Sequence, residues 1–180
     1  SIVIVQITDT QFGFFAENKN FEKETELYTE AVRKINEINP DFVIITGDFV
    51  NNSKNTSQIE EFKRITALID KNTSVYFSPG NHDLGQSPSK DEQKQFRWLK
   101  RQLHKFKKSD NIILFTHYPF FIHDFSEKET YSNQSMKVRI KYFQLFERYG
   151  VKAIFAGHLH NNAESVHNNI SMITTNAAGR

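Results

Sequence analysis

The chain contains no cysteine, which excludes disulfide bonds, thiolate nucleophiles and cysteine-based zinc sites. It also lacks an apolar run near the roughly 18 residues that a membrane-spanning helix needs. No charge sign dominates, because 23 Lys and Arg oppose 21 Asp and Glu; the formal net charge of +2 is too small to indicate a nucleic-acid or membrane surface. A metal site here must use His, Asp, Asn and Gln, and the cellular compartment stays open.

The pattern of apolar residues predicts one domain with alternating strands and helices. With 180 residues and no repeat or linker, the chain is long enough for a sizeable core. Runs rich in β-branched and aromatic residues predict buried strands at 2–8, 42–46, 74–78, 112–116 and 151–156. Amphipathic patterns predict helices at 28–38, at 59–68 behind a Ser57-x-x-Glu60 capping box, at 96–106 and from about Ser132 to Tyr149, and a hairpin around Asn168-Asn169.

Each predicted strand is followed by a residue of metal-ligating type. These residues are Asp9, Gly47-Asp48, Gly80-Asn81-His82-Asp83, His117 and Gly157-His158-Leu159-His160. In a layered α/β fold, ligands collect on the loops beyond the carboxyl ends of the strands. Any one of these residues could instead serve a turn. The tetrapeptide at 80–83, however, has a chance frequency on the order of one in a thousand for this length, so the joint pattern predicts a site.

The ordered set Asp9-x-Gln11, Gly47-Asp48, Gly80-Asn81-His82-Asp83, Thr116-His117 and Gly157-His158-x-His160 resembles the calcineurin-like metallophosphoesterase family. The resemblance covers essentially the whole chain. Most members carry Asp-x-His at the first motif, whereas the Asp-x-Gln opening is similar to the subgroup of calcineurin-like phosphoesterase domain-containing protein 1. The resemblance implies an α/β fold, namely a layered β-sandwich flanked by helices, here with part of the second sheet missing.

The resemblance also implies a cofactor of two divalent metal ions, drawn from Mn, Mg, Fe or Zn. One metal would be held by Asp9, Gln11, Asp48 and His160, and the other by Asp48, Asn81, His117 and His158. Asp48 would bridge them, because a carboxylate offers an oxygen to each of two cations.

The implied catalytic residues are His82 and Asp83. His82 would give a proton to the leaving oxygen, and Asp83 would accept a hydrogen bond from the other ring nitrogen of His82. The alternative for Asp83 is a helix cap, since aspartate is a preferred N-cap residue. The residues that bind substrate are not identified.

Gln11 departs from the family pattern. Its neutral amide oxygen binds metals more weakly than an imidazole nitrogen does, and it favours Mn²⁺ or Mg²⁺ over Zn²⁺ at the first site. The alternative is that Gln11 only forms hydrogen bonds within the site.

A second departure is the short segment between Asp83 and the helix that starts before Phe96, where the family has additional strands. The chain over 1–180 is expected to be a single metallophosphoesterase domain. Either it is a minimal variant, or further residues belong near 88–90 and beyond 180. We expect the second, because Gly85-Gln86-Ser87-Pro88 has no reason to adjoin a helix directly.

These features favour a metal-dependent phosphoester hydrolase that uses a metal-bridging hydroxide. A phosphomonoesterase is expected first, acting on a phosphorylated small molecule or on phosphoprotein serine or threonine. A phosphodiesterase or nuclease is the alternative within the enzyme class, and a decayed binding or scaffold protein is the alternative outside it. The basic run at 100–108 predicts a solvated helix face, so no nucleic-acid partner is expected.

Overall fold

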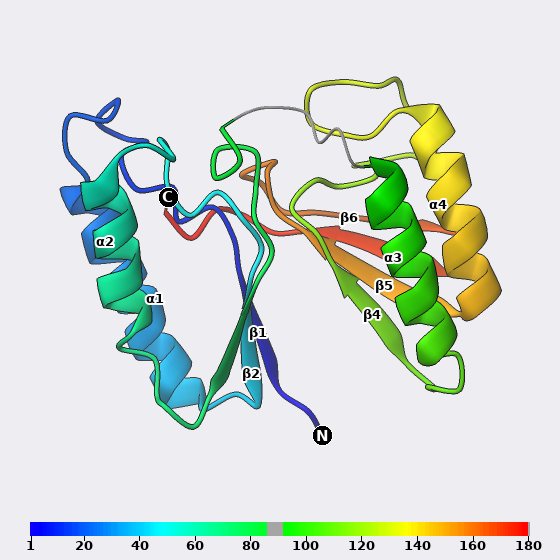
Figure 1. The fold of residues 1–180 in the computed structure, drawn as a ribbon, viewed down its shortest axis with the longest axis horizontal. Coiled ribbons are helices and arrows are strands. Elements are labelled where there is room, and N and C mark those ends of the chain that lie inside the picture. Colours follow the sequence, from blue (N-terminus) through cyan, green and yellow to red (C-terminus); the bar gives the residue numbers. More distant parts are fainter. Residues whose placement is uncertain (86–91, 180) are drawn as a thin grey trace.

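Two pairs of helices enclose two β-sheets in the computed structural model, which describes residues 1–85 and 92–179 (Figure 1). The first sheet is parallel with the order β1-β2-β3, formed by Ile4–Ile7, Phe42–Ile45 and Ser74–Phe77. The second has the order β4-β5-β7-β6, formed by Ile112–Phe115, Val151–Ala156, Ile170–Thr174 and Ala163–His167. The helices are α1 (Glu22–Ile38), α2 (Thr56–Thr66), α3 (Glu92–Lys105) and α4 (Met136–Tyr149).

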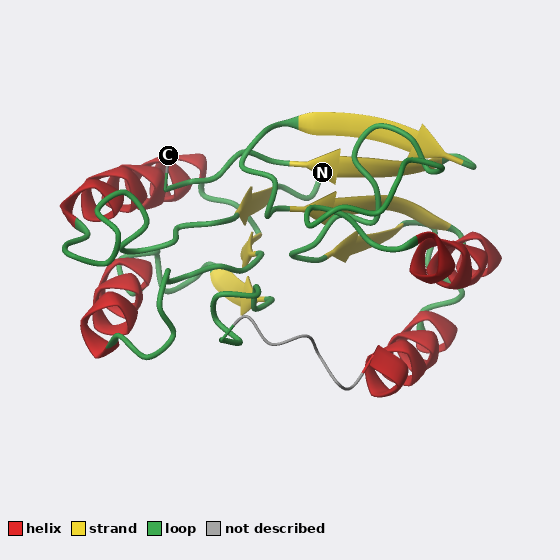
Figure 2. Ribbon diagram, turned by 90° about the horizontal axis from the view of Figure 1, so that it is seen from above, coloured by secondary structure: helices red, strands yellow, loops and turns green. Residues whose placement is uncertain are grey.

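Each sheet packs against its own helix pair through a separate hydrophobic core. The first core joins β1 and β2 to α1 and α2, with Tyr28, Val43 and Ile45 fully buried. The second joins β4, β5 and β7 to α3 and α4, with Phe143 and Ile154 at its centre. Figure 2 shows the result from above, with helices at both ends and strands between them. The apolar runs predicted five buried strands, and among these β2 and β5 are the most buried. The prediction is wrong for β3, which lies at the edge of its sheet with Tyr76 and Phe77 55% and 51% exposed.

The two halves are joined near the carboxyl ends of the strands. Gln6 on β1 donates from Nε2 to Thr46 Oγ1 at 3.0 Å and to the Ala156 carbonyl oxygen of the second sheet at 3.3 Å. The segment after β7 then crosses back to the first half, where Ala178 N–H donates to the Thr8 carbonyl oxygen at 2.8 Å. These bonds hold the loops of both sheets together.

The predicted elements are largely confirmed, but every helix begins at another residue than predicted. The α1 and α3 helices begin at Glu22 and Glu92, before the predicted 28 and 96. The α2 helix is capped by Asn55, whose side chain accepts from Gln58 N–H, so the predicted Ser57-x-x-Glu60 capping box is wrong. The helix begins early because Asn55 has an extended backbone and an amide oxygen in capping position. The α4 helix starts after Ser135 rather than near Ser132. The hairpin turns at Asn168 and Asn169, both with positive φ as a tight two-residue turn requires.

The predicted fold class, a mixed α/β fold with two sheets flanked by helices, is confirmed. The expected break at Pro88 to Lys90 falls outside the described residues, and the single-domain prediction with its extra residues stays a prediction. Within 1–85 and 92–179, no helix is both long and apolar enough to cross a membrane.

Candidate metal centre

Glycines bring the strand-end loops into contact at the edge where the candidate ligands lie. A Cβ on Gly80 would stand 2.5 Å from the backbone nitrogen of Asp48, and one on Gly157 would stand 1.8 Å from Thr8 Oγ1. Neither position has room for a side chain. The glycines of the Gly-Asn-His-Asp and Gly-His-x-His motifs thus permit the close approach of loops from both sheets.

The backbone at most of the candidate ligands is strained. The φ angles of Asp9, Gln11, Asp48, His158 and His160 are 53°, 38°, 49°, 67° and 55°. Residues other than glycine seldom adopt this left-handed conformation, although asparagine, aspartate and histidine do so more often than the others, and such strain concentrates at functional sites. Five candidate ligands at such positions support a functional site here, in which the surrounding structure holds the strained backbone in place.

One group of predicted ligands surrounds the Asp48 carboxylate. Single donor atoms of Asp48, His117 and His158 all lie within 4.8 Å of one another. His117 Nε2 is 3.3 Å from Asp48 Oδ2 and 3.2 Å from Asn81 Oδ1. Its Nδ1 lies 2.8 Å from the Thr46 carbonyl oxygen, the backbone partner that metal-bound histidines commonly have.

The second group lies around Asp9, which is completely buried. His160 Nε2 is 3.2 Å from Asp9 Oδ1, while Thr8 Oγ1 and the His158 N–H donate to Asp9 Oδ2 at 2.6 and 2.9 Å. His158 therefore links the two groups, since its ring belongs to one and its backbone to the other. The structure brings all seven predicted ligand residues to this region.

Gln11 is 4% exposed, and its backbone N–H donates to the Asp48 carbonyl oxygen at 2.9 Å. Its Nε2 donates to Asn51 Oδ1 at 3.3 Å, whereas its Oε1 is buried and has no hydrogen-bond partner among the described residues. A buried amide oxygen without a partner is costly unless a cation or water meets it. The donor set of two carboxylates, two amide oxygens and three imidazoles fits divalent cations.

Burial and neighbouring charges shift the pKa values of three ionisable residues in the site. Burial lowers the pKa of His158 to about 4, so its imidazole is neutral and able to bind a metal. Burial also acts against the charge of His117, but the hydrogen bond and charge of Asp48 outweigh it and raise its pKa. For Asp9, burial is outweighed by His160 and His117, and the pKa is lowered. Asp9 is thus held as a carboxylate.

The predicted pairing of Asp83 with His82 is wrong. Asp83 Oδ2 accepts from Gly80 N–H at 2.8 Å and Oδ1 from Phe49 N–H at 2.9 Å, so its carboxylate holds the loops together. The Nδ1 of His82 instead lies 2.9 Å from the Asn51 carbonyl oxygen. A carboxylate that follows the histidine directly in sequence is turned away from the ring by the loop's hydrogen bonds. The alternative as a helix cap also fails, because residues 81–85 form turns.

Sequence reasoning missed two residues, Asn51 and Tyr131. Asn51 contacts both Gln11 and His82, and its position three residues after Asp48 was the available signal. Tyr131 lies on the long segment between β4 and α4, beyond the Thr116-His117 motif with which that segment begins. Its hydroxyl oxygen lies 3.2 Å from Asn81 Nδ2, and only the folded structure reveals this contact.

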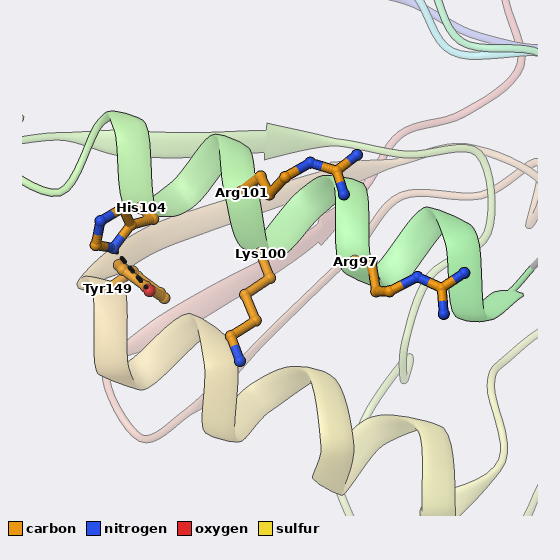
Figure 3. A pocket seen from close by; sticks show the side chains of 5 residues that line it. All are labelled: Arg97, Lys100, Arg101, His104 and Tyr149. Atoms are coloured by element: carbon orange, nitrogen blue, oxygen red, sulfur yellow. Dashed lines mark hydrogen bonds between the residues drawn. The ribbon is translucent and has the colours of Figure 1, made fainter.

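A basic groove of about 370 Å³ lies elsewhere, between α3 and α4 (Figure 3). It is lined by Arg97, Lys100, Arg101, His104 and Tyr149, and contains none of the candidate ligands. The sticks point in different directions rather than toward one point, and the basic side chains are exposed. The groove matches the predicted solvated helix face.

The family model for calcineurin-like phosphoesterases matches residues 2–96 and 84–162. The chain belongs to this family. It is 26% identical to serine/threonine-protein phosphatase CPPED1 of Mus musculus over 232 aligned residues, which cover 97% of this chain and 74% of that protein. The aligned length exceeds the chain's 180 residues, so the relative has residues without a counterpart here.

One further relative by sequence and one solved structure are also similar to this chain. The chain is 24% identical to the "Probable glycerophosphodiester phosphodiesterase GpdQ" of Arcobacter nitrofigilis, over 96% of this chain and 77% of that protein. A dimetal phosphatase structure from Danio rerio has the same fold, with a TM-score of 0.69 and 12% identity over 98% of this chain and 88% of that one. The predicted family, its likeness to CPPED1 and metal-dependent phosphoester hydrolysis are therefore confirmed, and the cofactor is divalent metal.

Proposed function

We propose that this protein is a dinuclear metallophosphatase that hydrolyses phosphomonoesters. The observation that carries the proposal is the pair of adjacent ligand groups joined through His158, one around Asp48 and one around Asp9. Asp9, Gln11, Asp48 and His160 would hold the first cation, and Asp48, Asn81, His117 and His158 the second. Mn²⁺ or Mg²⁺ is favoured at the first site, because Gln11 contributes a neutral oxygen.

The metals, when bound, would supply positive charge for the phosphoryl oxygens and an acidified water. The protein's own contribution is position and proton transfer. The Asn51 carbonyl oxygen, 2.9 Å from His82 Nδ1, favours a proton on that nitrogen. It thereby assigns proton donation to Nε2 of His82, which would protonate the leaving oxygen.

The proposed substrate class is taken from the names of the relatives. CPPED1 is named a serine/threonine-protein phosphatase, which favours a monoester on a phosphoprotein. The GpdQ relative is named a phosphodiesterase, and for that reason diester hydrolysis is the second candidate. Comparing hydrolysis of p-nitrophenyl phosphate with that of bis(p-nitrophenyl) phosphate, both in Mn²⁺, separates them. A higher kcat/KM for the diester would refute the monoesterase.

A binding or scaffold protein without turnover is the remaining alternative. It is tested by His82→Ala, which should abolish Mn²⁺-stimulated hydrolysis while the protein still binds metal. His104→Ala is the matched control, since His104 lies at the end of α3 in the basic groove. A wild-type protein that binds Mn²⁺ and hydrolyses neither ester would favour the scaffold.

A further inference from the structure

Tyr131 contacts two candidate ligands of the same metal through different atoms. Its hydroxyl oxygen lies 3.2 Å from Asn81 Nδ2, and its backbone carbonyl oxygen lies 3.3 Å from His158 Nε2. Its ring centroid is also 4.9 Å from that of His158. The residue itself is 71% exposed, so core packing does not explain its placement.

The contact with Asn81 bears on which amide atom faces the metal. An asparagine amide binds a cation only through its oxygen, and rotating the group by half a turn exchanges oxygen and nitrogen. With Nδ2 donating to the Tyr131 hydroxyl, Oδ1 lies toward His117, 3.2 Å from Nε2. No other acceptor for Nδ2 occurs among residues 1–85 and 92–179. The hydroxyl therefore favours the orientation that a ligand needs.

The contact with His158 selects the ring nitrogen that faces the metal. A neutral imidazole carries one N–H, and Nε2–H donates to the Tyr131 carbonyl oxygen in this arrangement. The unprotonated Nδ1 is then the atom available to a cation. A backbone carbonyl on the distal nitrogen is the usual way in which proteins orient metal-binding histidines.

The segment around Tyr131 is held firmly enough to act in this way. Thr130 N–H donates to Asn133 Oδ1 at 2.7 Å, and Asn133 Nδ2 donates to the Lys128 carbonyl oxygen at 3.1 Å. The fully buried Arg139 donates from Nε to the Gln134 carbonyl oxygen at 2.7 Å. These bonds fix the backbone on both sides of Tyr131, although its side chain is exposed.

We propose that Tyr131 is a positioning residue for the second metal: its hydroxyl sets the Asn81 amide with the oxygen toward the cation, and its carbonyl sets the His158 ring. The inference rests on the proposed function, because it concerns the metal held by Asp48, Asn81, His117 and His158. Replacement of an outer partner of a ligand lowers metal affinity by roughly 10- to 100-fold. We expect the lower end, because water reaches this exposed position.

The test is calorimetric titration of the metal-stripped full chain with MnCl₂. Tyr131→Phe removes only the hydroxyl and should weaken binding at one site by about tenfold. Tyr149→Phe is the matched control, because its hydroxyl lies 3.4 Å from His104 Nδ1 in the basic groove. The decisive variant is Asn81→Asp, in which either orientation presents an oxygen. Tyr131→Phe should cause no loss of affinity in that background.

Two outcomes would overturn the inference while the proposed function stands: unchanged Mn²⁺ affinity in Tyr131→Phe, or an equal loss in the wild-type and Asn81→Asp backgrounds. The second would mean that Tyr131 acts on the fold and not on the Asn81 amide. The melting temperature of metal-free Tyr131→Phe, which we expect to equal that of the wild type, checks this separately. Metal binding without hydrolysis would refute the proposed function alone. A wild-type chain that binds no divalent cation would refute both.

Discussion

Replacing Gln11 with methionine should affect stability differently in the absence and in the presence of a divalent metal. Methionine has similar length and no hydrogen-bonding nitrogen or oxygen, so the change removes the amide oxygen and nitrogen without a large cavity. In the metal-free protein, it loses one hydrogen bond of 3.3 Å to Asn51 and the buried Oε1 that has no partner among the described residues.

The magnitude follows from these two terms. A hydrogen bond contributes roughly 0.5–1.5 kcal/mol, and an unsatisfied buried polar atom costs roughly 1–3 kcal/mol. The metal-free variant should therefore match the wild type or exceed its free energy of unfolding by about 1 kcal/mol. With Mn²⁺, the loss of one ligand should reverse the sign; a tenfold weaker first site would remove about 1.4 kcal/mol of metal-dependent stabilisation.

Urea unfolding in EDTA and in saturating Mn²⁺, each with wild type and Gln11→Met, measures both values. An equal change under the two conditions would mean that the Gln11 oxygen is not a metal ligand. A clear destabilisation in EDTA would instead support the alternative that Gln11 acts only through hydrogen bonds within the site.

Three other predictions concern the proton donor, the loop contact and the segment before α4. His82→Ala should lower kcat by roughly 10²- to 10⁴-fold with metal content unchanged, as measured by steady-state kinetics and elemental analysis; loss of metal would count against an acid role. Gly80→Ala should destabilise the fold by roughly 1–3 kcal/mol in urea, because its Cβ would meet the Asp48 backbone nitrogen, and a neutral result would contradict the packing described. Burial opposes ionisation of Glu127, but backbone N–H donors outweigh it and lower the pKa of Glu127. The contribution of Glu127 to the free energy of unfolding is therefore present above its unfolded pKa of about 4.3, and it is lost as pH falls through the lower pKa of the folded state. Glu127→Gln should reduce the loss in free energy of unfolding between neutral and acid pH, and an unchanged dependence on pH in the acid range would contradict this role of Glu127.

The sequence predicted the architecture well because apolar periodicity and strand-end motifs are local signals. The strands at 42–46 and 151–156 and the turn at Asn168-Asn169 depend on residues close in sequence, and the structure has them at those places. The seven candidate ligands could also be predicted, since they lie on the loops that follow strands, and parallel strands deliver such residues to one edge.

The partners of those ligands could not be predicted in the same way. Asp83 follows His82 in sequence, yet the loop points its carboxylate at backbone N–H groups, and the Asn51 carbonyl takes the expected place. Tyr131 is 50 residues from Asn81, and no pattern in the segment before α4 indicates their contact. Contacts of this kind depend on how loops from different sheets meet, which the sequence of either loop leaves open.

The metal content of the purified protein, after loading with Mn²⁺ and gel filtration, shows whether Asp48 bridges two cations. We expect two metal ions per chain in the wild type and in His104→Ala, and a loss of both in Asp48→Ala, because the Asp48 carboxylate is assigned to both sites. A wild-type chain with one ion or none, or an Asp48→Ala variant that keeps two, would contradict a dinuclear centre bridged by Asp48.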